Sequence, residues 1–280
     1  MRVVRSETET VSPVVAFEAL GADVVLEGGE RGWEATYIAS EPVDTFVYRR
    51  DDGDGCFGCL GRWLETLPDS DVRTAAGAYG FVGYDVAKEV EEVPEETERD
   101  TEVPDAWFGF YDTVAVLSED AAHVEAVEHG TQDAPAEERA RRFVERLEGY
   151  DGNATQEEAL TVTDRRSNFD REEYEDAVRR VKGYVREGET FQANISQRLS
   201  FDSEASPLAL YARLRETNPG PYMGLIDVDG EDDGWSVVSS SPELLVSVEG
   251  ATLRTRPIAG TRPRAGDDDG MRDEPAANEK

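Results

Sequence analysis

Lysine and histidine are nearly absent from this 280-residue sequence, which contains three lysines and two histidines. Lysine and arginine together number 29 against 62 aspartates and glutamates, so the formal net charge is −33 at pH 7. Because neutralising phosphate groups requires a basic face, this charge argues against a nucleic-acid-binding protein. The same charge argues against attachment to an anionic membrane surface.

Long apolar runs are missing as well. No run approaches the ~18 apolar residues that a membrane-spanning helix needs. The first residues, Met1–Arg5, lack the apolar core of a signal peptide. Ten Phe, ten Tyr and four Trp nevertheless supply enough large side chains for a packed core. We therefore expect a globular, cytoplasmic protein with no membrane partner.

Cysteine is scarce, and the two cysteines, Cys56 and Cys59, form one Cys-x-x-Cys motif. A zinc site needs four ligands, and only His123 and His129 are left to complete one. Both histidines belong to an alternating stretch around residues 121–127, which is typical of a strand with a polar end. The sequence therefore favours two incidental thiols over a metal or redox centre.

Short apolar runs broken by Gly and Asp dominate residues 1–150. The runs at 24–26 and 36–39 flank the Gly28–Gly29 turn as in a hairpin. The small and aromatic residues 78–84 predict a strand that another backbone approaches closely. Further strands are expected at residues 46–48, 107–111 and 113–117, and a helix at residues 136–147.

A polar stretch, residues 151–168, is expected to be a linker to a second region, residues 169–280. There, Asp170 caps a helix that Gly188 ends, and Pro207 opens another helix. Strands are expected at residues 191–201, 223–228, 235–239, 244–248 and 252–256. Because strands and helices do not alternate regularly, we predict an α+β fold with largely antiparallel sheets and flanking helices.

The stretch from Arg254 to Arg264 holds the clearest candidate for a binding site. Four arginines flank a Pro-Ile-Ala-Gly-Thr turn. Gly260 lets a backbone approach a ligand closely, and its N–H together with that of Thr261 suits a carboxylate. Arginine side chains are bidentate partners for the same anion. The alternative is a loop whose arginines balance the surplus acid of the protein itself.

Four motifs in this order resemble the chorismate-binding enzyme family: Gly188–Gln192, Asn218–Met223, Ser239–Glu243 and Thr255–Arg264. That family includes anthranilate synthase component I, aminodeoxychorismate synthase component I, and isochorismate and salicylate synthases. Residues 80–85, read with Glu89, are similar to its N-terminal region. The resemblance implies a fold like anthranilate synthase component I, in which residues 1–150 form the N-terminal region and residues 169–280 begin the catalytic domain.

The resemblance also implies roles for individual residues. Gly260, Thr261 and Arg262 would bind chorismate. Residues 221–223 (Pro221, Tyr222 and Met223) would line the pocket that receives the inhibitor tryptophan in anthranilate synthases. Gly28 stands where the inhibitor motif of those enzymes has a serine, so tryptophan should bind weakly. Magnesium is implied as a cofactor, with its glutamate ligand expected after Lys280 and none in this chain.

Gln192 occupies the position where isochorismate and salicylate synthases resemble one another in carrying a lysine base. A glutamine amide cannot take a proton near neutral pH, so water is a poor nucleophile here. The resemblance therefore favours ammonia as the nucleophile, delivered by a glutamine amidotransferase partner. The 280-residue chain alone is expected to be inactive and marginally stable, because segments that complete the family's second domain would follow it.

The product is the point on which the signals conflict. Ala259 stands where better-known aminodeoxychorismate synthases carry a nucleophilic lysine, and in this it resembles anthranilate synthases. Residues 192–198 and 39–42 are closer to aminodeoxychorismate synthases. We favour aminodeoxychorismate synthase of the para-aminobenzoate (folate) pathway. Anthranilate synthase component I of tryptophan biosynthesis is the alternative, and a non-catalytic chorismate-binding protein is the second alternative.

Dense acid along the whole chain with almost no lysine is typical of proteins from a high-salt cytoplasm, where ions screen the self-repulsion. We predict that the melting temperature of the protein rises as KCl is increased into the molar range. Thermal melts at several KCl concentrations measure this. A melting temperature that does not respond to KCl contradicts the halophilic interpretation and favours an acidic protein from an ordinary cell.

Overall fold

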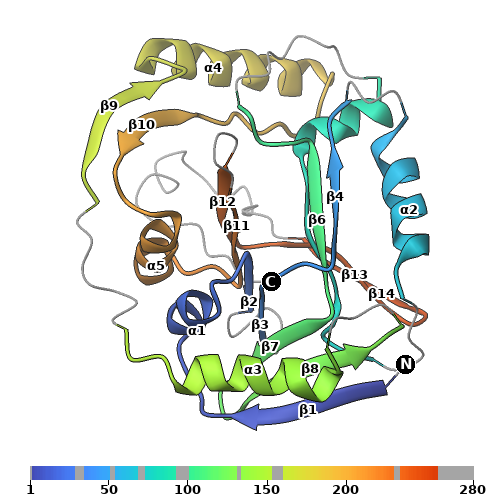
Figure 1. Cartoon of the computed structure of the whole chain (residues 1–280). Coiled ribbons are helices and arrows are strands. Elements are labelled where there is room, and N and C mark those ends of the chain that lie inside the picture. Colours follow the sequence, from blue (N-terminus) through green and yellow to red (C-terminus); the bar gives the residue numbers. More distant parts are fainter. Residues whose placement is uncertain are drawn as a thin grey trace.

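The centre of the fold is a seven-stranded sheet in the order β1-β8-β7-β3-β2-β11-β12 (Figure 1). The computed structural model describes residues 2–28, 35–50, 54–68, 73–92, 101–130, 134–152, 160–229 and 234–257. The strands of this sheet are β1 (Arg2–Thr8), β2 (Val24–Gly28), β3 (Thr36–Ala39), β7 (Thr113–Leu117), β8 (Ala122–Glu128), β11 (Tyr222–Val228) and β12 (Trp235–Ser241). All the strand pairs found in the described residues are antiparallel. The predicted α+β class with antiparallel sheets is confirmed.

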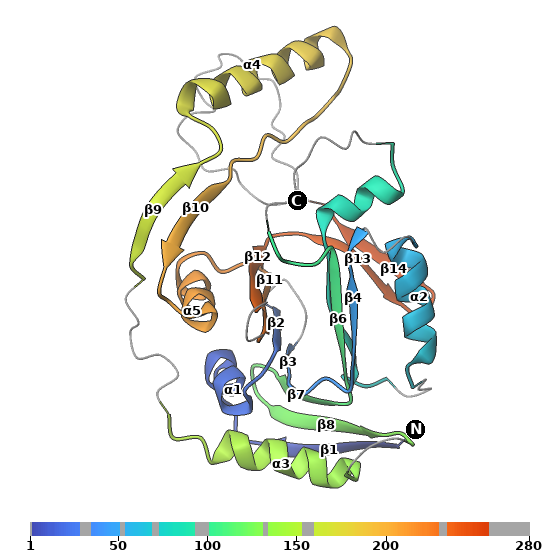
Figure 2. The ribbon, with the colours of Figure 1, turned by 45° about the horizontal axis from the view of Figure 1, so that its top comes forward.

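Three helices cover one face of this sheet: α1 (Pro13–Leu20), α3 (Ala136–Glu148) and α5 (Pro207–Thr217) (Figure 2). Alternate strand residues such as Val25 and Leu225 point toward them and are fully buried. The start of α1 is fixed by Ser12, whose Oγ accepts a hydrogen bond of 3.2 Å from the Val15 N–H. This layer forms the largest core of the molecule.

The opposite face packs against a three-stranded sheet in the order β4-β6-β5. Its strands are β4 (Asp44–Tyr48), β5 (Gly77–Val82) and β6 (Ala106–Tyr111). Aromatic rings fill the space between the two sheets, with Trp107 and Phe81 both edge-on to Trp235 at centroid distances of 5.8 and 5.6 Å. A Cβ at Gly80 would lie 1.9 Å from the Trp107 carbonyl oxygen, so the predicted close backbone approach is present.

Helix α2 (Cys56–Thr66) covers the outer side of the smaller sheet, and Glu89 secures its first turn. Glu89 ends the short 3₁₀ helix η2 (Tyr84–Glu89). Its Oε2 accepts a hydrogen bond of 2.6 Å from the Cys56 N–H, and its Oε1 accepts one of 2.6 Å from the Tyr48 hydroxyl. A carboxylate at the N-terminus of α2 satisfies a backbone donor that no side chain of the helix reaches.

Glu125 on β8 is a buried carboxylate that ties the two sheets together. It accepts hydrogen bonds from the Ala75 N–H at 2.7 Å and the Thr74 hydroxyl at 3.0 Å, just before β5. Arg5 Nε on β1 lies 2.7 Å from its Oε1. Burial acts to raise the pKa of Glu125, but these hydrogen bonds, His123 and the charge of Arg5 hold that pKa below its ordinary value.

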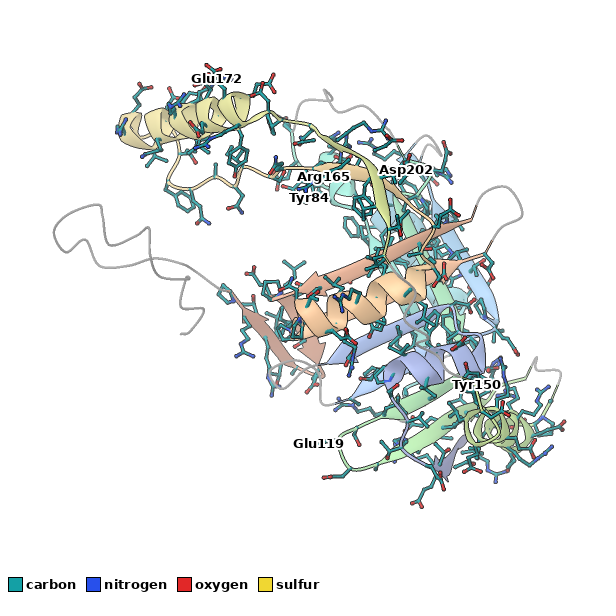
Figure 3. All side chains as sticks on the ribbon, turned by 90° about the vertical axis from the view of Figure 1, so that its left-hand side faces the viewer. Tyr84, Glu119, Tyr150, Arg165, Glu172 and Asp202 are labelled. Carbon is teal, nitrogen blue, oxygen red and sulfur yellow. The ribbon has the colours of Figure 1, made fainter. Side chains whose placement is uncertain are left out.

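Most of the region after residue 160 is exposed. Strands β9 (Val162–Ser167) and β10 (Leu199–Ser203) pair with each other, as do β13 (Leu244–Glu249) and β14 (Thr252–Arg256). Helix α4 (Arg171–Glu187) has the predicted Asp170 capping box and Gly188 C-cap, but no residue of it is buried. Figure 3 shows α4, marked by Glu172, standing apart from the main body. In the part of the chain described, no helix is long and apolar enough to cross a membrane.

The structure differs from the sequence-based expectations at two places after residue 150. Strand β9 lies inside the expected linker, residues 151–168, of which residues 153–159 lie outside the described residues. Only residues 199–201 of the strand expected at 191–201 are in β10. Strands β11 and β12 extend the sheet that begins in the first half.

Most of residues 191–198 are exposed, and none of them is in a strand. The Tyr174 hydroxyl donates to the Ile195 carbonyl at 3.2 Å, and the Arg198 N–H donates to Asn168 Oδ1 at 2.7 Å. The alternation of polar and apolar residues in this segment therefore does not correspond to a strand.

Asp23 lies where β2, the end of β3 and β11 meet. Its N–H donates to the Ala39 carbonyl at 3.0 Å, its carbonyl accepts from the Asp227 N–H at 2.8 Å, and its Oδ2 accepts from the Glu41 N–H at 3.0 Å. Burial raises the pKa of Asp23 from 3.8 to about 6. The Glu41 N–H and the Tyr111 hydroxyl oppose this shift, while the charges of Asp229 and Glu41 add to it.

The raised pKa means that the folded chain binds this proton more tightly than the unfolded chain. Asp23 therefore makes the free energy of unfolding fall as the pH rises from about 4 to about 6. We predict that Asp23→Asn stabilises the protein at pH 7 by about 1 kcal/mol, a value reduced for solvent around a half-buried side chain. This gain in stability should vanish below about pH 4, because Asp23 is then uncharged in both the folded and the unfolded chain.

Urea unfolding of both proteins across this pH range measures the difference. Asp120→Asn is the matched control, because Asp120 is exposed in the turn after β7 and the substitution removes the same charge. An equal gain from both substitutions would mean that relief of general charge repulsion, and not burial of Asp23, is responsible.

Candidate functional site

The pairing of β2 with β11 sets two residues of the predicted regulatory pocket, Gly28 and Tyr222, opposite each other. Tyr222 pairs with Gly28 and Met223 pairs with Glu27. Directly paired residues in antiparallel strands point to the same face, so Tyr222 and Gly28 lie on one side of the sheet and Met223 on the other. Pro221 immediately precedes β11 and is half-buried, like Tyr222.

Met223 is a core residue in this structure. It is 3% exposed and packs in the cluster between the seven-stranded sheet and its helices. The predicted pocket set is therefore divided between two faces of the sheet. On the face of Tyr222, Gly28 contributes no side chain that would donate to a ligand.

On the helix face, Glu27 holds α5 against β2. The Tyr211 hydroxyl donates to Glu27 Oε2 at 2.5 Å, and Arg215 Nε lies 2.8 Å from each carboxylate oxygen. Tyr211 is fully buried, and burial followed by the Glu27 charge raises the pKa of its hydroxyl, which stays protonated as a donor. With both oxygens occupied by donors, Glu27 is suited to positioning α5 and the chain that leads into β11.

Two of the four family-like motifs touch each other beside this cluster. The Ser240 hydroxyl donates to the Asn218 carbonyl at 2.8 Å, which joins the end of β12 to the end of α5. A Cβ at Gly220 would lie 2.7 Å from Ser240 Oγ and 2.9 Å from the Ser241 carbonyl oxygen, so this packing requires glycine or a shift of the backbone. Ser241 Oγ accepts from the Glu243 N–H at 3.3 Å and forms the local turn into β13.

Gln192 lies in a different part of the fold, on the irregular segment between α4 and β10. Its side chain is exposed, and its backbone carbonyl accepts a hydrogen bond of 3.0 Å from the Thr190 hydroxyl. Phe191 beside it is 92% exposed. The structure thus places the Gly188–Gln192 motif on the exposed unit formed by β9, α4 and β10.

The predicted chorismate-binding residues Gly260, Thr261 and Arg262, together with Ala259, lie outside the described residues. The chain that leads to them is β14, where Arg254 and Arg256 are both exposed. Residues two apart in a strand share a face, so these two arginines lie on the same side of the β13–β14 hairpin.

The two cysteines lie at the start of α2, and each histidine contacts a carboxylate. Cys56 is buried at the first position of α2, and Cys59 is half-buried one turn later. His123 Nε2 lies 3.2 Å from Glu125 Oε1, and His129 Nε2 lies 3.1 Å from Asp112 Oδ2. Within the described ranges, no group of three or more His, Cys, Asp and Glu is arranged to hold a metal ion.

The Glu27, Tyr211 and Arg215 cluster was not predicted from the sequence. Two signals for it are visible there. Tyr211 and Arg215 are four residues apart on a helix, and Glu27 follows the apolar residues 24–26 of a strand. What the sequence does not show is that this strand and this helix are neighbours.

Comparisons with known proteins agree with the motifs. A sequence model of the chorismate binding enzyme family matches residues 24–280. Over 88% of its length the chain is 33% identical to an anthranilate synthase component 1 of Haloarcula marismortui, of which it covers 53%. It is 31% identical over 84% of its length to the aminodeoxychorismate synthase component 1 of Bacillus subtilis, of which it covers 50%. The chain thus spans about half the length of these curated relatives.

Among solved structures, anthranilate synthase component I from Streptococcus pneumoniae matches with a TM-score of 0.67 and 24% identity. The match covers 91% of this chain and 62% of that one. This likeness concerns the fold, and it confirms the predicted resemblance to an anthranilate synthase component I.

We predict that Glu27→Ala lowers the free energy of unfolding by about 2–4 kcal/mol, because it leaves the buried Tyr211 hydroxyl and the Arg215 guanidinium without their acceptor. Glu27→Gln should cost less, since its amide oxygen still accepts from Tyr211. Glu216→Ala, which breaks the exposed Arg213 pair on the same helix, is the control and should cost under about 0.5 kcal/mol. Chemical denaturation at neutral pH measures the free energy of unfolding of all three variants. Similar decreases for Glu27→Ala and Glu216→Ala would refute a stabilising role of the Glu27, Tyr211 and Arg215 cluster.

Proposed function

The chain belongs to the chorismate binding enzyme family, and from this premise we propose that it is part of component I of a chorismate-aminating synthase. The names of its relatives support an aminating synthase, since they include both anthranilate synthase and aminodeoxychorismate synthase. Because the chain spans about half the length of these relatives, its activity, substrate and partners are all part of the proposal.

Gln192 is the observation on which the choice of nucleophile depends. A neutral amide accepts hydrogen bonds but does not remove a proton from water at physiological pH. Ammonia has its own lone pair and needs no such base. The proposal therefore includes a glutamine amidotransferase partner as the source of ammonia.

Aminodeoxychorismate is the product that we favour. Gly28 supports this choice, because at the β2–β11 pair it offers no hydroxyl to a bound tryptophan beside Tyr222. Ala259 favours anthranilate as the alternative product, since alanine has no nucleophile to attack the ring. A non-catalytic chorismate-binding protein is the second alternative.

Magnesium remains part of the proposal as a family expectation. The described residues do not present a ligand cluster that fits it. The binding groups that this chain contributes in the proposal are Gly260, Thr261 and Arg262, with backbone N–H groups and a guanidinium for a substrate carboxylate.

The test uses a chimera in which this chain replaces the matching part of the Haloarcula marismortui relative. We expect the chimera to consume chorismate with ammonium and magnesium, and the 280-residue chain alone to show no turnover. Chromatography identifies the product, and the unaltered relative is the positive control.

Each other outcome of this experiment has a definite meaning. Conversion of chorismate to isochorismate without ammonium would overturn the amination proposal. An inactive chimera beside an active parent favours the non-catalytic alternative. Micromolar tryptophan binding in calorimetry, or anthranilate as the product, favours anthranilate synthase.

A further inference from the structure

The two cysteines lie on one side of the first turn of α2. Cys56 is the first residue of the helix and Cys59 follows three positions later, so both sulfurs are neighbours on the helix surface. Both pack in the same small cluster under α2, which also contains Phe46 and Tyr48. Neither cysteine is bonded to the other in this structure.

Cys59 has the surroundings of a reactive thiol. Its side chain is half-buried, and Arg62 Nη2 lies 3.2 Å from its Sγ. The same guanidinium donates to Asp54 Oδ2 at 2.8 Å, which holds it across the helix start. A half-buried sulfur is within reach of a small disulfide, and Arg62 supplies a hydrogen-bond donor beside it.

Cys56 has the opposite surroundings. It is fully buried, and Glu89 Oε2 accepts a hydrogen bond of 2.6 Å from its backbone N–H. Burial, followed by the negative charge of Glu89, raises the pKa of the Cys56 thiol to about 11. Cys56 therefore stays protonated and shielded until a disulfide forms beside it.

We propose that Cys56 and Cys59 are a redox pair, in which Cys59 attacks a small-molecule disulfide and Cys56 resolves the product into an intrahelical disulfide. This inference is independent of the proposed function. It departs from the incidental thiols that the sequence alone favours, because the Arg62 and Glu89 contacts become visible only in the fold.

The chemistry balances without any further reactant. The Cys59 thiolate bonds to one sulfur of the disulfide, the S–S bond breaks, and the departing thiolate takes up a proton. Cys56 then loses its proton to solvent as its sulfur bonds to Cys59 Sγ, and the second small thiol leaves. Two protein thiols are oxidised, and one small disulfide is reduced to two thiols.

The first turn of α2 must tighten to form this bond. Cβ atoms three residues apart in a helix are about 5–6 Å apart, whereas a disulfide brings them to about 3.5–4.5 Å. The N-cap, Gly55, provides no side-chain hydrogen bond. Because Glu89 holds the Cys56 N–H, Cys59 is the residue that must move.

The experiment exposes the folded 280-residue chain to bis(2-hydroxyethyl) disulfide. An uncharged probe is needed because a chain of net charge −33 repels anionic disulfides. Intact mass after alkylation of the remaining thiols is the readout. We expect the wild-type chain to lose two hydrogens and take up no alkylating agent.

Single substitutions separate the two roles. Cys56→Ser should stop at a stable mixed disulfide on Cys59, and Cys59→Ser should stay unmodified while folded. Arg62→Gln should slow the first step severalfold, because Cys59 Sγ loses its guanidinium hydrogen-bond donor. Arg141→Gln is the matched control, since Arg141 is also an exposed helical arginine paired with an acid, and it should leave the rate unchanged.

Two results would overturn the proposal. One is a wild-type chain that keeps both thiols free under conditions that oxidise the urea-unfolded chain. The other is faster modification of Cys59→Ser than of Cys56→Ser, which would reverse the assigned roles. Circular dichroism of each variant establishes that the chain under test is folded.

Discussion

The rest of the molecule depends on the pairing of β2 with β11. Val25 pairs with Leu225, and both are fully buried. Strand β2 lies between β3 and β11, so its hydrogen-bonding groups are used on both edges. Helices α1 and α5 share a face of the sheet only because this pairing sets their strands side by side. Without it, the two parts of the chain would have separate and smaller cores.

The register of this pairing also determines the candidate site. It places Glu27 on the face of α5, within reach of Tyr211 and Arg215, and places Gly28 beside Tyr222 on the other face. A slip of one residue would exchange the two faces. Glu27 would then be buried between the sheets, away from both of its donors. The charge cluster and the strand pairing therefore specify the same register.

Local signals in the sequence predicted the elements that local interactions form. The β2–β3 hairpin, α4 with its Asp170 cap, and α5 after Pro207 are all present. Helix α1 was missed because it is short and apolar on most sides, so it shows no helical period. Strand β9 was missed because its residues are polar and exposed, and its partner β10 alone defines it as a strand.

The candidate site was predictable only in part, for the same reason. The resemblance assigned Gly28 and residues 221–223 to one pocket, and the strand pairing sets Gly28 opposite Tyr222 but turns Met223 to the other face. It did not identify Arg215, nor the way Glu89 reaches the start of α2, because both depend on elements far apart in sequence. The exposed alternation at residues 191–198 was misleading, because these residues face solvent and no strand forms there.

The position of β11 late in the chain has a consequence for synthesis on the ribosome. When the first 150 residues have emerged, β2 already has its partner β3 but offers an open edge where β11 will later pair. An open, apolar strand edge is a template for pairing with other chains. Completing the sheet requires a contact between distant parts of the sequence, which forms slowly. The high negative charge of the nascent chain repels its neighbours during that delay, so the same charge that shapes the folded surface also protects the unfinished sheet.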